Sequence, residues 1–206
     1  MNDATLKYVL PDPAGYAEAV ALLRQGEVVA YPTETVYGLA VDPRSETALE
    51  QLFILKGRPE TNPVLMVIAD QAQLQALVKR IDAYTQRLID AFWPGPLTLL
   101  FPAPEGLPPQ LSAGSGKIAL RCPAAPIARA LCYHFGGAIT STSANRSGEA
   151  PARSADEIDI PGLRLCIRGE DSGAQPPSTL YDPESDRILR EGPITRAMID
   201  TLRTSP

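Results

Sequence analysis

The chain has 206 residues, of which 44% are hydrophobic and 21% are charged, so it is long enough to bury the core of a folded domain. Its net charge of −5 argues against nonspecific nucleic-acid binding, and no apolar run is long enough to cross a bilayer. The N-terminus has neither the basic nor the apolar region of a secretory signal, so we expect a cytoplasmic protein without membrane contact. Three separated cysteines and a single histidine, His134, form no disulfide framework and no zinc motif. Ser–His or Cys–His catalysis would therefore rest on His134 alone.

Helical patterns alternate with short apolar runs along the chain. Helices are expected at residues 12–26, 45–56, 71–78, 83–92, 126–135, from 154 onward and at 194–203. Strands are expected at residues 28–31, 64–69, 97–101, 118–122, 138–140, 163–167, 179–181 and 188–190. Asp12, Asp70 and Asp82 are expected helix caps, and Ser154 to Glu157 has the capping-box pattern. The alternation predicts one α/β domain over residues 1–206, with a core of about 10–200, built around a mixed sheet.

The segment Tyr31–Leu39 follows the expected strand at 28–31 and presents Thr33, Glu34 and Thr35 where that strand ends. Open α/β sheets bind ligands beyond the carboxyl ends of their strands, which favours a site here. An ordinary surface turn would contain the same residue types, so this segment alone supports a site only modestly.

Further polar clusters lie at the ends of other expected elements. Lys56 to Pro63 contains Lys-Gly-Arg-Pro, which would hold the Arg58 guanidinium on a short rigid loop for an anion, although a solvated helix end explains it equally well. Thr140 to Gly148 offers consecutive hydroxyls and small residues suited to phosphate, or an ordinary serine- and threonine-rich loop. Ser178 and Arg190 form the last cluster.

The segment Gly114–Lys117 resembles a phosphate-binding loop but does not fit the pattern. The first glycine of a P-loop would fall at Leu111, and Ile118 replaces the hydroxyl that binds magnesium. A dinucleotide-binding fingerprint would have to open a helix, whereas this segment precedes an expected strand. We therefore reject both motifs and keep Lys117 and Arg121 only as candidates for facing a ligand.

Seven motifs together resemble a known family. They are Tyr-Pro-Thr-Glu-Thr-Val-Tyr-Gly-Leu (31–39), Lys-Gly-Arg-Pro with Asn-Pro (56–63), Trp-Pro-Gly-Pro-Leu-Thr (93–98), Ile-Ala-Leu-Arg (118–121), Ser-Thr-Ser-Ala-Asn-Arg-Ser-Gly (141–148), Pro-Ser-Thr (177–179) and Ile-Leu-Arg-Glu-Gly (188–192). Their order resembles that of the YrdC-like domains, the threonylcarbamoyl-AMP synthases, over about residues 10–200. Seven ordered motifs are far more specific than any single one.

The resemblance implies a twisted, open mixed sheet flanked by helices, with a concave and positively charged cleft. It implies the synthesis of threonylcarbamoyl-AMP and pyrophosphate from L-threonine, bicarbonate or CO2, and ATP, with Mg²⁺ helping pyrophosphate to leave. The product would serve a downstream transferase complex that modifies an adenosine beside the anticodon of tRNA.

The resemblance also implies residue roles. The expected catalytic residues are Lys56 and Arg58. The expected threonine-side contacts are Thr33, Thr35, Arg121, Ser141 and Ser178. The expected nucleotide contacts are Arg58, Asn62, Ser143, Asn145 and Arg190. No residue is assigned to a metal.

Both reactants are anionic, so this chemistry needs positioning and charge stabilisation more than a covalent nucleophile. Lys56, Arg58 and Arg190 would neutralise the triphosphate, and Arg121 would grip the threonine carboxylate bidentately. Glu34 is either a base or metal ligand, or a loop carboxylate paired with an arginine.

Three positions depart from the family pattern. Val67 stands where many members have a histidine near the threonine site. Residues 151–153 read Pro-Ala-Arg where many members have Ser-Pro-Thr, and Glu191 replaces a common proline after Arg190. The chain also ends soon after the domain, so we do not expect the extra C-terminal domain of the longer members.

Two other classes stay open. A non-catalytic RNA-binding module of the same fold would use the cleft for RNA phosphates, but the acidic net charge counts against it. The carbamoyl-adenylate domain of hydrogenase-maturation proteins belongs to much longer chains with zinc-finger-like cysteines, a feature this sequence lacks.

Overall fold

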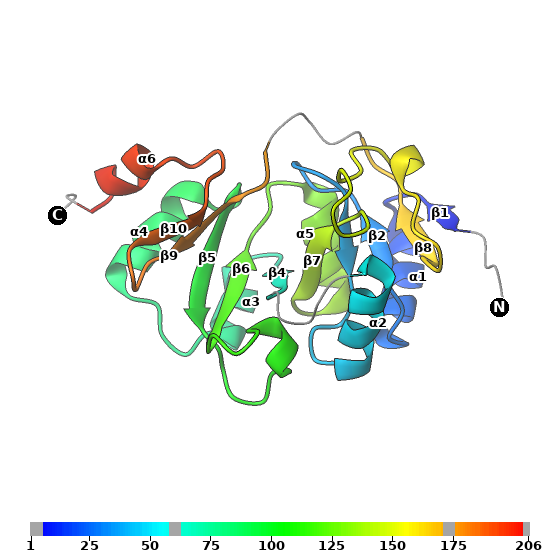
Figure 1. Cartoon of the computed structure of the whole chain (residues 1–206), viewed down its shortest axis with the longest axis horizontal. Helices are drawn as coiled ribbons and strands as arrows, with labels where there is room; N and C mark the ends of the chain where they lie inside the picture. Colours follow the sequence, from blue (N-terminus) through cyan, green and yellow to red (C-terminus); the bar gives the residue numbers. More distant parts are fainter. Residues whose placement is uncertain (1–5, 58–62, 171–175, 204–206) are drawn as a thin grey trace.

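In the computed structural model, residues 6–57, 63–170 and 176–203 are described. Within these ranges ten strands form one sheet, in the order β1–β8–β2–β3–β7–β4–β6–β5–β9–β10 (Figure 1). The strands are β1 (Lys7–Val9), β2 (Val29–Tyr31), β3 (Gly38–Ala40), β4 (Leu65–Val67), β5 (Leu97–Pro102), β6 (Lys117–Arg121), β7 (Ile139–Ser143), β8 (Leu165–Ile167), β9 (Thr179–Asp182) and β10 (Arg187–Arg190). The sheet contains both parallel pairs, such as β4 with β6, and antiparallel pairs, such as β3 with β7. The predicted mixed α/β sheet is confirmed.

Helices cover both faces of the sheet (Figure 1). They are α1 (Pro13–Arg24), α2 (Glu46–Lys56), α3 (Gln71–Leu77), α4 (Ala83–Phe92), α5 (Pro126–Phe135) and α6 (Arg196–Thr201), with short 3-10 turns at Pro109–Leu111 and Ala155–Glu157. Side chains of a strand point alternately to its two faces, so each strand supplies both cores. In β2, Val29 and Tyr31 belong to the buried cluster that includes α1 and α5, whereas Ala30 belongs to the cluster on the other face, which includes α2.

The expected helix caps form as the sequence predicts. The Asp12 carboxylate accepts from the Gly15 N–H at 2.8 Å, and the Asp70 carboxylate accepts from the Gln73 N–H at 3.0 Å. Asp82 caps α4 in the same way. At the other end of α2, Gly57 adopts a left-handed conformation with φ 59°, which a glycine tolerates without strain and which stops the helix directly after Lys56.

Several local predictions differ from the structure. Strand β3 was not expected, because Gly-Leu-Ala has too short a pattern to signal a strand without its partners β2 and β7. Strand β7 runs on to Ser143, so most of the hydroxyl cluster after residue 140 lies in the sheet rather than in a loop. The predicted capping box is wrong: Ser154 makes no cap hydrogen bond, and the Glu157 carboxylate accepts from the Arg153 N–H at 2.6 Å instead of from the N-cap residue.

Candidate functional site

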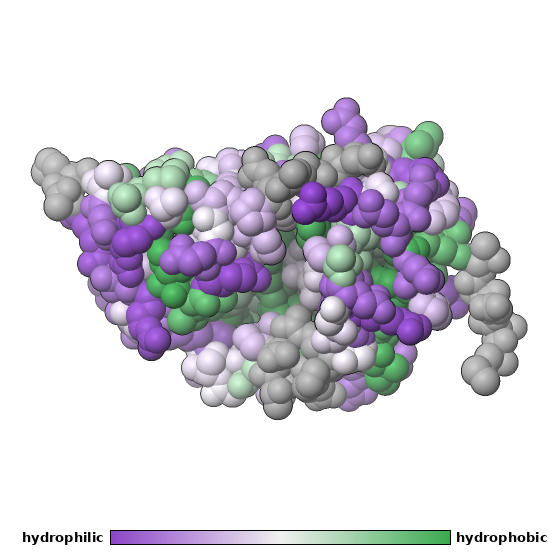
Figure 2. All heavy atoms as spheres, turned by 45° about the horizontal axis from the view of Figure 1, so that its top comes forward, coloured by the Kyte–Doolittle hydropathy of each residue, from purple (hydrophilic) through white to green (hydrophobic). Residues whose placement is uncertain are grey.

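A pocket of about 220 Å³ lies where the β2–β3 connection, β6, β7 and the segment before β9 meet. Its described lining residues are Thr33, Thr35, Val36, Tyr37, Gly38, Pro63, Leu65, Arg121, Ser141, Thr142, Ser143, Pro151, Pro177, Ser178 and Arg190. Figure 2 shows the molecule hollowed near the middle of this face. Strands β3, β7, β4 and β6 are neighbours in the sheet, so segments far apart in sequence converge here.

Thr33 organises the turn between β2 and β3. Its Oγ1 accepts from the N–H groups of Thr35 and Val36, both at 3.2 Å, and donates to the Val36 carbonyl at 2.6 Å. The Thr33 and Thr35 hydroxyls are 3.0 Å apart, and both residues are buried. These local bonds fold the turn tightly and bring both hydroxyls into the pocket wall.

Arg121, at the end of β6, is held by two partners. Its Nε donates to the Gly95 carbonyl at 2.9 Å, and its Nη2 donates to the Glu34 carboxylate at 2.6 Å. Glu34 also accepts from the Ala124 N–H at 2.7 Å. Burial alone would raise the pKa of Glu34, but the Arg121 charge and the Ala124 N–H hold that pKa below its usual value. Glu34 is therefore an ionised carboxylate paired with an arginine.

Strand β7 supplies the hydroxyls of another wall. Ser141 and Ser143 alternate along β7, so their side chains share a face, and both line the pocket. Gly38 of β3 pairs with Ser143. A Cβ on Gly38 would lie 3.1 Å from the Tyr31 ring and 3.2 Å from the Ser141 Oγ, so only glycine lets β3 approach without pressing on this wall.

Ser178 and Arg190 come together on the side of the pocket formed by β9 and β10. The Arg190 Nε and Nη2 donate to the Ser178 carbonyl at 3.0 and 2.9 Å, and Nη2 lies 3.1 Å from the Ser178 Oγ. The Ser178 Oγ is also 2.7 Å from the Thr98 hydroxyl. Two residues predicted for different substrates therefore touch each other at one edge of the pocket.

Lys56 and Asn145 lie beside the pocket rather than among the described residues that line it. The buried Lys56 Nζ donates to the carbonyls of Ser143 and Asn145 at 2.5 and 2.9 Å, and lies 3.4 Å from the Asn145 Oδ1. The lysine thus links the end of α2 to the end of β7. Arg58 and Asn62 lie outside the described residues.

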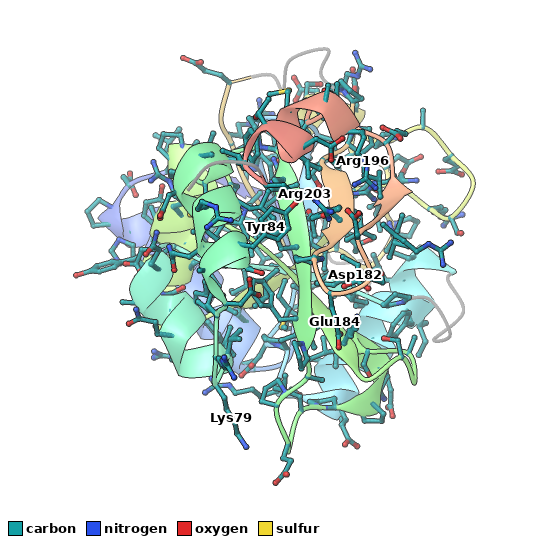
Figure 3. The ribbon with its side chains drawn as sticks, turned by 90° about the vertical axis from the view of Figure 1, so that its left-hand side faces the viewer. Lys79, Tyr84, Asp182, Glu184, Arg196 and Arg203 are labelled. Carbon is teal, nitrogen blue, oxygen red and sulfur yellow. The ribbon has the colours of Figure 1, made fainter. Side chains whose placement is uncertain are left out.

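Lys117 is the first residue of β6, at the opposite end of the strand from Arg121. Its Nζ is 2.7 Å from the Asp182 Oδ2 and 2.7 Å from the Glu184 Oε2, which ties the start of β6 to the β9–β10 hairpin. Figure 3 shows both carboxylates at this hairpin. Among the described lining residues of the pocket, β6 is represented by Arg121 and not by Lys117.

The turn of the β9–β10 hairpin is anchored by α6 and α4. The Asp186 carboxylate pairs with Arg203 and, at 2.5 Å, with Arg196, and it accepts from the Tyr181 hydroxyl at 2.8 Å. The Tyr84 hydroxyl of α4 is 3.0 Å from that of Tyr181, and Figure 3 shows Tyr84 and Arg203 close together. The opposite end of the same hairpin carries the pocket residues of β9 and β10, so this cluster helps to fix their position.

Comparison with known proteins decides the family. The model of the Sua5/YciO/YrdC family, described as "Telomere recombination", matches residues 21–192. The chain belongs to this family. A curated relative from Halorhodospira halophila, named threonylcarbamoyl-AMP synthase, is 42% identical over 181 residues, covering 86% of this chain and 95% of the relative. A Bacillus subtilis relative with the same name is 37% identical over 206 residues, covering 97% of this chain and 59% of the relative.

Solved structures of the Sua5/YciO/YrdC family have the same fold. P. abyssi Sua5 complexed with L-threonine is 34% identical with a TM-score of 0.86, covering 92% of this chain. This chain spans only 57% of that longer protein. E. coli YciO, at 24% identity and a TM-score of 0.77, matches 92% of this chain and supports the fold alone.

The departures from the family pattern can now be placed. Val67 lies directly opposite Arg121 on β4, fully buried in the apolar cluster beneath α5, and its carbonyl accepts from the Cys132 thiol at 3.4 Å. Pro151 lines the pocket, whereas the Ala152 carbonyl accepts from the Tyr37 N–H at 2.9 Å. The position beside Arg121 where many members of the family have a histidine is therefore apolar here.

Sequence reasoning found the polar residues of the pocket but not its apolar wall. Val36, Tyr37, Leu65 and Pro177 line the pocket without having been proposed as site residues. Val36, Tyr37 and Pro177 lie within the seven motifs and Leu65 lies two residues after one, which is the signal that could have found them. The pairing of Glu34 with Arg121 spans 87 positions and had no sequence signal that could specify it.

Proposed function

We propose that this protein is an L-threonylcarbamoyladenylate synthase that forms threonylcarbamoyl-AMP and pyrophosphate from L-threonine, bicarbonate or CO2, and ATP. The observation that carries the proposal is the pocket itself: it joins Thr35, Arg121 and Ser178, from separate segments of a chain whose curated relatives are named threonylcarbamoyl-AMP synthase. The P. abyssi Sua5 structure contains L-threonine, which supports threonine as the amino-acid substrate.

Threonine would bind at the Arg121 side. Because Nε and one N–H of Nη2 are engaged by Gly95 and Glu34, the edge formed by Nη1 and the other N–H of Nη2 is the part of the guanidinium suited to a carboxylate. The Thr35 hydroxyl lies in the same wall and can hydrogen-bond a polar group of the amino acid. These contacts would orient the neutral α-amino group, whose nitrogen bonds to the carbon of bicarbonate with loss of water, or of CO2 with loss of a proton, to give a carbamate.

ATP would bind toward Arg190 and the β7 hydroxyls. A carbamate oxygen attacks the α-phosphorus, the bond from that phosphorus to the bridging oxygen of the β-phosphate breaks, and pyrophosphate leaves. Arg190 and the Ser143 hydroxyl both line the pocket and can stabilise phosphate oxygens as charge builds up. Roles for Arg58 and Asn62 in nucleotide binding stay predictions, as does a direct catalytic role for Lys56. The Lys56 amine would hold the end of β7 in place through the carbonyls of Ser143 and Asn145.

Mg²⁺ is the metal that the proposed reaction implies. Within the described residues, no three histidine, cysteine or acidic side chains come together in a way that could hold a metal ion. We therefore assign no residue to Mg²⁺ and derive no step through it. Mg²⁺ would instead accompany the phosphates of ATP, where it usually keeps most of its ligands as water and phosphate oxygens.

The product would be passed to the transferase complex that modifies tRNA. That partner, a cytoplasmic location and direct RNA binding stay predictions. Within the described residues, no helix has both the length and the apolar character needed to span a bilayer. A non-catalytic RNA-binding role is the alternative, and it predicts steep loss of RNA affinity with salt and no ATP turnover.

The proposal is tested by incubating the purified chain with ATP, L-threonine and ¹³C-bicarbonate and identifying the product by mass spectrometry. We expect an adenylate that contains the threonine mass and one ¹³C. L-serine and D-threonine in place of L-threonine serve as matched controls. An adenylate that forms without L-threonine, or no adenylate at all under conditions in which the Halorhodospira halophila relative is active, would contradict the proposed function.

A further inference from the structure

We propose that Glu34 is the positioning residue that fixes the Arg121 guanidinium for the carboxylate of the amino-acid substrate. The inference rests on the proposed function, because it gives the pocket an amino-acid ligand. It assigns to Glu34 neither proton transfer nor metal binding, but the task of setting which edge of Arg121 the substrate meets.

The contacts of Arg121 define its orientation. The side chain is 5% exposed, and its Nε and Nη2 are fixed by Gly95 and Glu34 at 2.9 and 2.6 Å. A guanidinium is planar, so two hydrogen bonds from different nitrogens fix both the plane and its rotation. Gly95 alone would leave the group free to turn about the Nε contact. Glu34 therefore supplies the second anchor that holds Arg121 in the pocket wall.

Glu34 is itself held by the start of α5. Its carboxylate accepts from the N–H groups of Ala124 and Ala125, at 2.7 and 3.3 Å. Ala125 is the N-cap residue of α5, so both N–H groups that Glu34 accepts from lie just before the first turn of the helix. The positive end of a helix dipole stabilises a carboxylate at this position. Glu34 can therefore stay ionised in the wall between the β2–β3 turn and β6.

The same arrangement divides two cavities. Thr33 lines both the substrate pocket and a neighbouring cavity of about 460 Å³, whereas Arg121 lines only the first and Glu34 only the second. The ion pair thus forms part of the partition between them. Glu34 contacts Arg121 from the side of the neighbouring cavity, so its negative charge stays out of the lining that would receive an anionic substrate. This explains how a carboxylate can sit 2.6 Å from Arg121 and still leave an edge of the guanidinium for another carboxylate.

The test compares Glu34→Gln with wild-type protein. Glutamine keeps the length of the side chain and one acceptor but loses the charge and turns an NH₂ donor toward the Ala125 N–H, so the second anchor of Arg121 should weaken. Isothermal titration calorimetry should show L-threonine binding weakened about tenfold or more, since small misplacements of a positioning group cost this much, with the KM for ATP changed far less. The NMR signal of the Arg121 Nη protons, seen at low temperature in ligand-free wild type, should disappear in Glu34→Gln.

Two further variants separate positioning from folding. Glu18→Gln removes the exposed ion pair with Lys7 and is the matched control, with threonine binding expected at the wild-type level. Glu34→Asp keeps a negative charge beside the start of α5 but shortens the reach to Arg121, so it should fold even where Glu34→Gln does not, and should still lose threonine affinity. Unchanged threonine affinity in folded Glu34→Gln or Glu34→Asp would overturn the proposal. Absence of threonine binding in wild type, with loss of the Arg121 signal in Glu34→Gln, would instead contradict the proposed function while supporting the hold of Glu34 on Arg121.

Discussion

Replacing Gly192 with alanine should damage the pocket from a position outside its lining. Gly192 follows β10 and packs against the segment that carries Ser178. A Cβ at this position would lie 2.4 Å from the Thr179 nitrogen, 2.5 Å from the Pro177 carbonyl oxygen and 2.7 Å from the Ser178 carbonyl carbon. All these atoms belong to backbone, so no side-chain rotation can relieve the overlap.

The size of the effect follows from these distances. Non-bonded heavy atoms prefer separations of about 3.5–4.0 Å, so the two backbone segments must move apart by about 1 Å. Overpacking of this kind typically costs about 1–3 kcal/mol of stability, which for a chain of this length lowers the melting temperature by roughly 2–4 °C for each kcal/mol. A displacement of about 1 Å at a substrate-positioning residue can reduce the rate about 100-fold. Because Ser178 and Arg190 flank the contact, Gly192→Ala should lose far more activity than stability.

The assay measures thermal unfolding and kcat/KM for L-threonine and for ATP in Gly192→Ala and wild type. Gly137→Ala is the matched control, since a Cβ there would meet no atom within 4 Å. We expect the control to keep both stability and activity. Wild-type activity in Gly192→Ala would refute the reasoning: either the backbones do not approach so closely, or Ser178 and Arg190 need no precise placement.

Three other predictions test separate parts of the structure. Arg58→Ala should abolish adenylate formation while circular dichroism and melting temperature stay unchanged, and near-normal turnover of the folded variant would exclude its catalytic role. Lys56→Met removes a buried charged donor from the Ser143 and Asn145 carbonyls and should cost about 2–4 kcal/mol, seen as a lower urea midpoint; an unchanged midpoint would contradict this. Burial works to raise the pKa of Asp182, but hydrogen bonds from Lys117 and Ser185 outweigh it and hold that pKa below the usual value. Its stabilising contribution should therefore be present above about pH 5 and fall away below about pH 4, and the acid-sensitive part of the unfolding free energy should shrink in Lys117→Met.

The sequence predicted the helices well because their ends carry local chemical signals. Asp12, Asp70 and Asp82 cap the helices that they were expected to cap, and Gly57 ends α2 where its left-handed conformation is needed. The strands β1 and β3 were missed: β1 is an exposed edge strand that pairs with β8, and β3 begins with a glycine, which has little strand preference. Short strands are specified by their partners, which a local pattern does not contain.

In the candidate site, too, local features could be predicted from the sequence but long-range contacts could not. Hydroxyls and arginines at strand ends could be picked out, and the structure brings Thr33, Thr35, Arg121, Ser178 and Arg190 to one pocket. Contacts between residues distant in sequence, such as Glu34 with Arg121 and Thr98 with Ser178, could not be predicted from local patterns. The sequence left Lys117 as a candidate for facing a ligand, whereas its amine forms ion pairs with the β9–β10 hairpin.

The most direct test of the central claim is pyrophosphate release from ATP and bicarbonate, measured with and without L-threonine. The account predicts release that depends on L-threonine, saturates with it, and is lost in Arg121→Ala while that variant stays folded. Release at the same rate without L-threonine, or none with all substrates present, would contradict the assignment of this pocket to threonine and ATP.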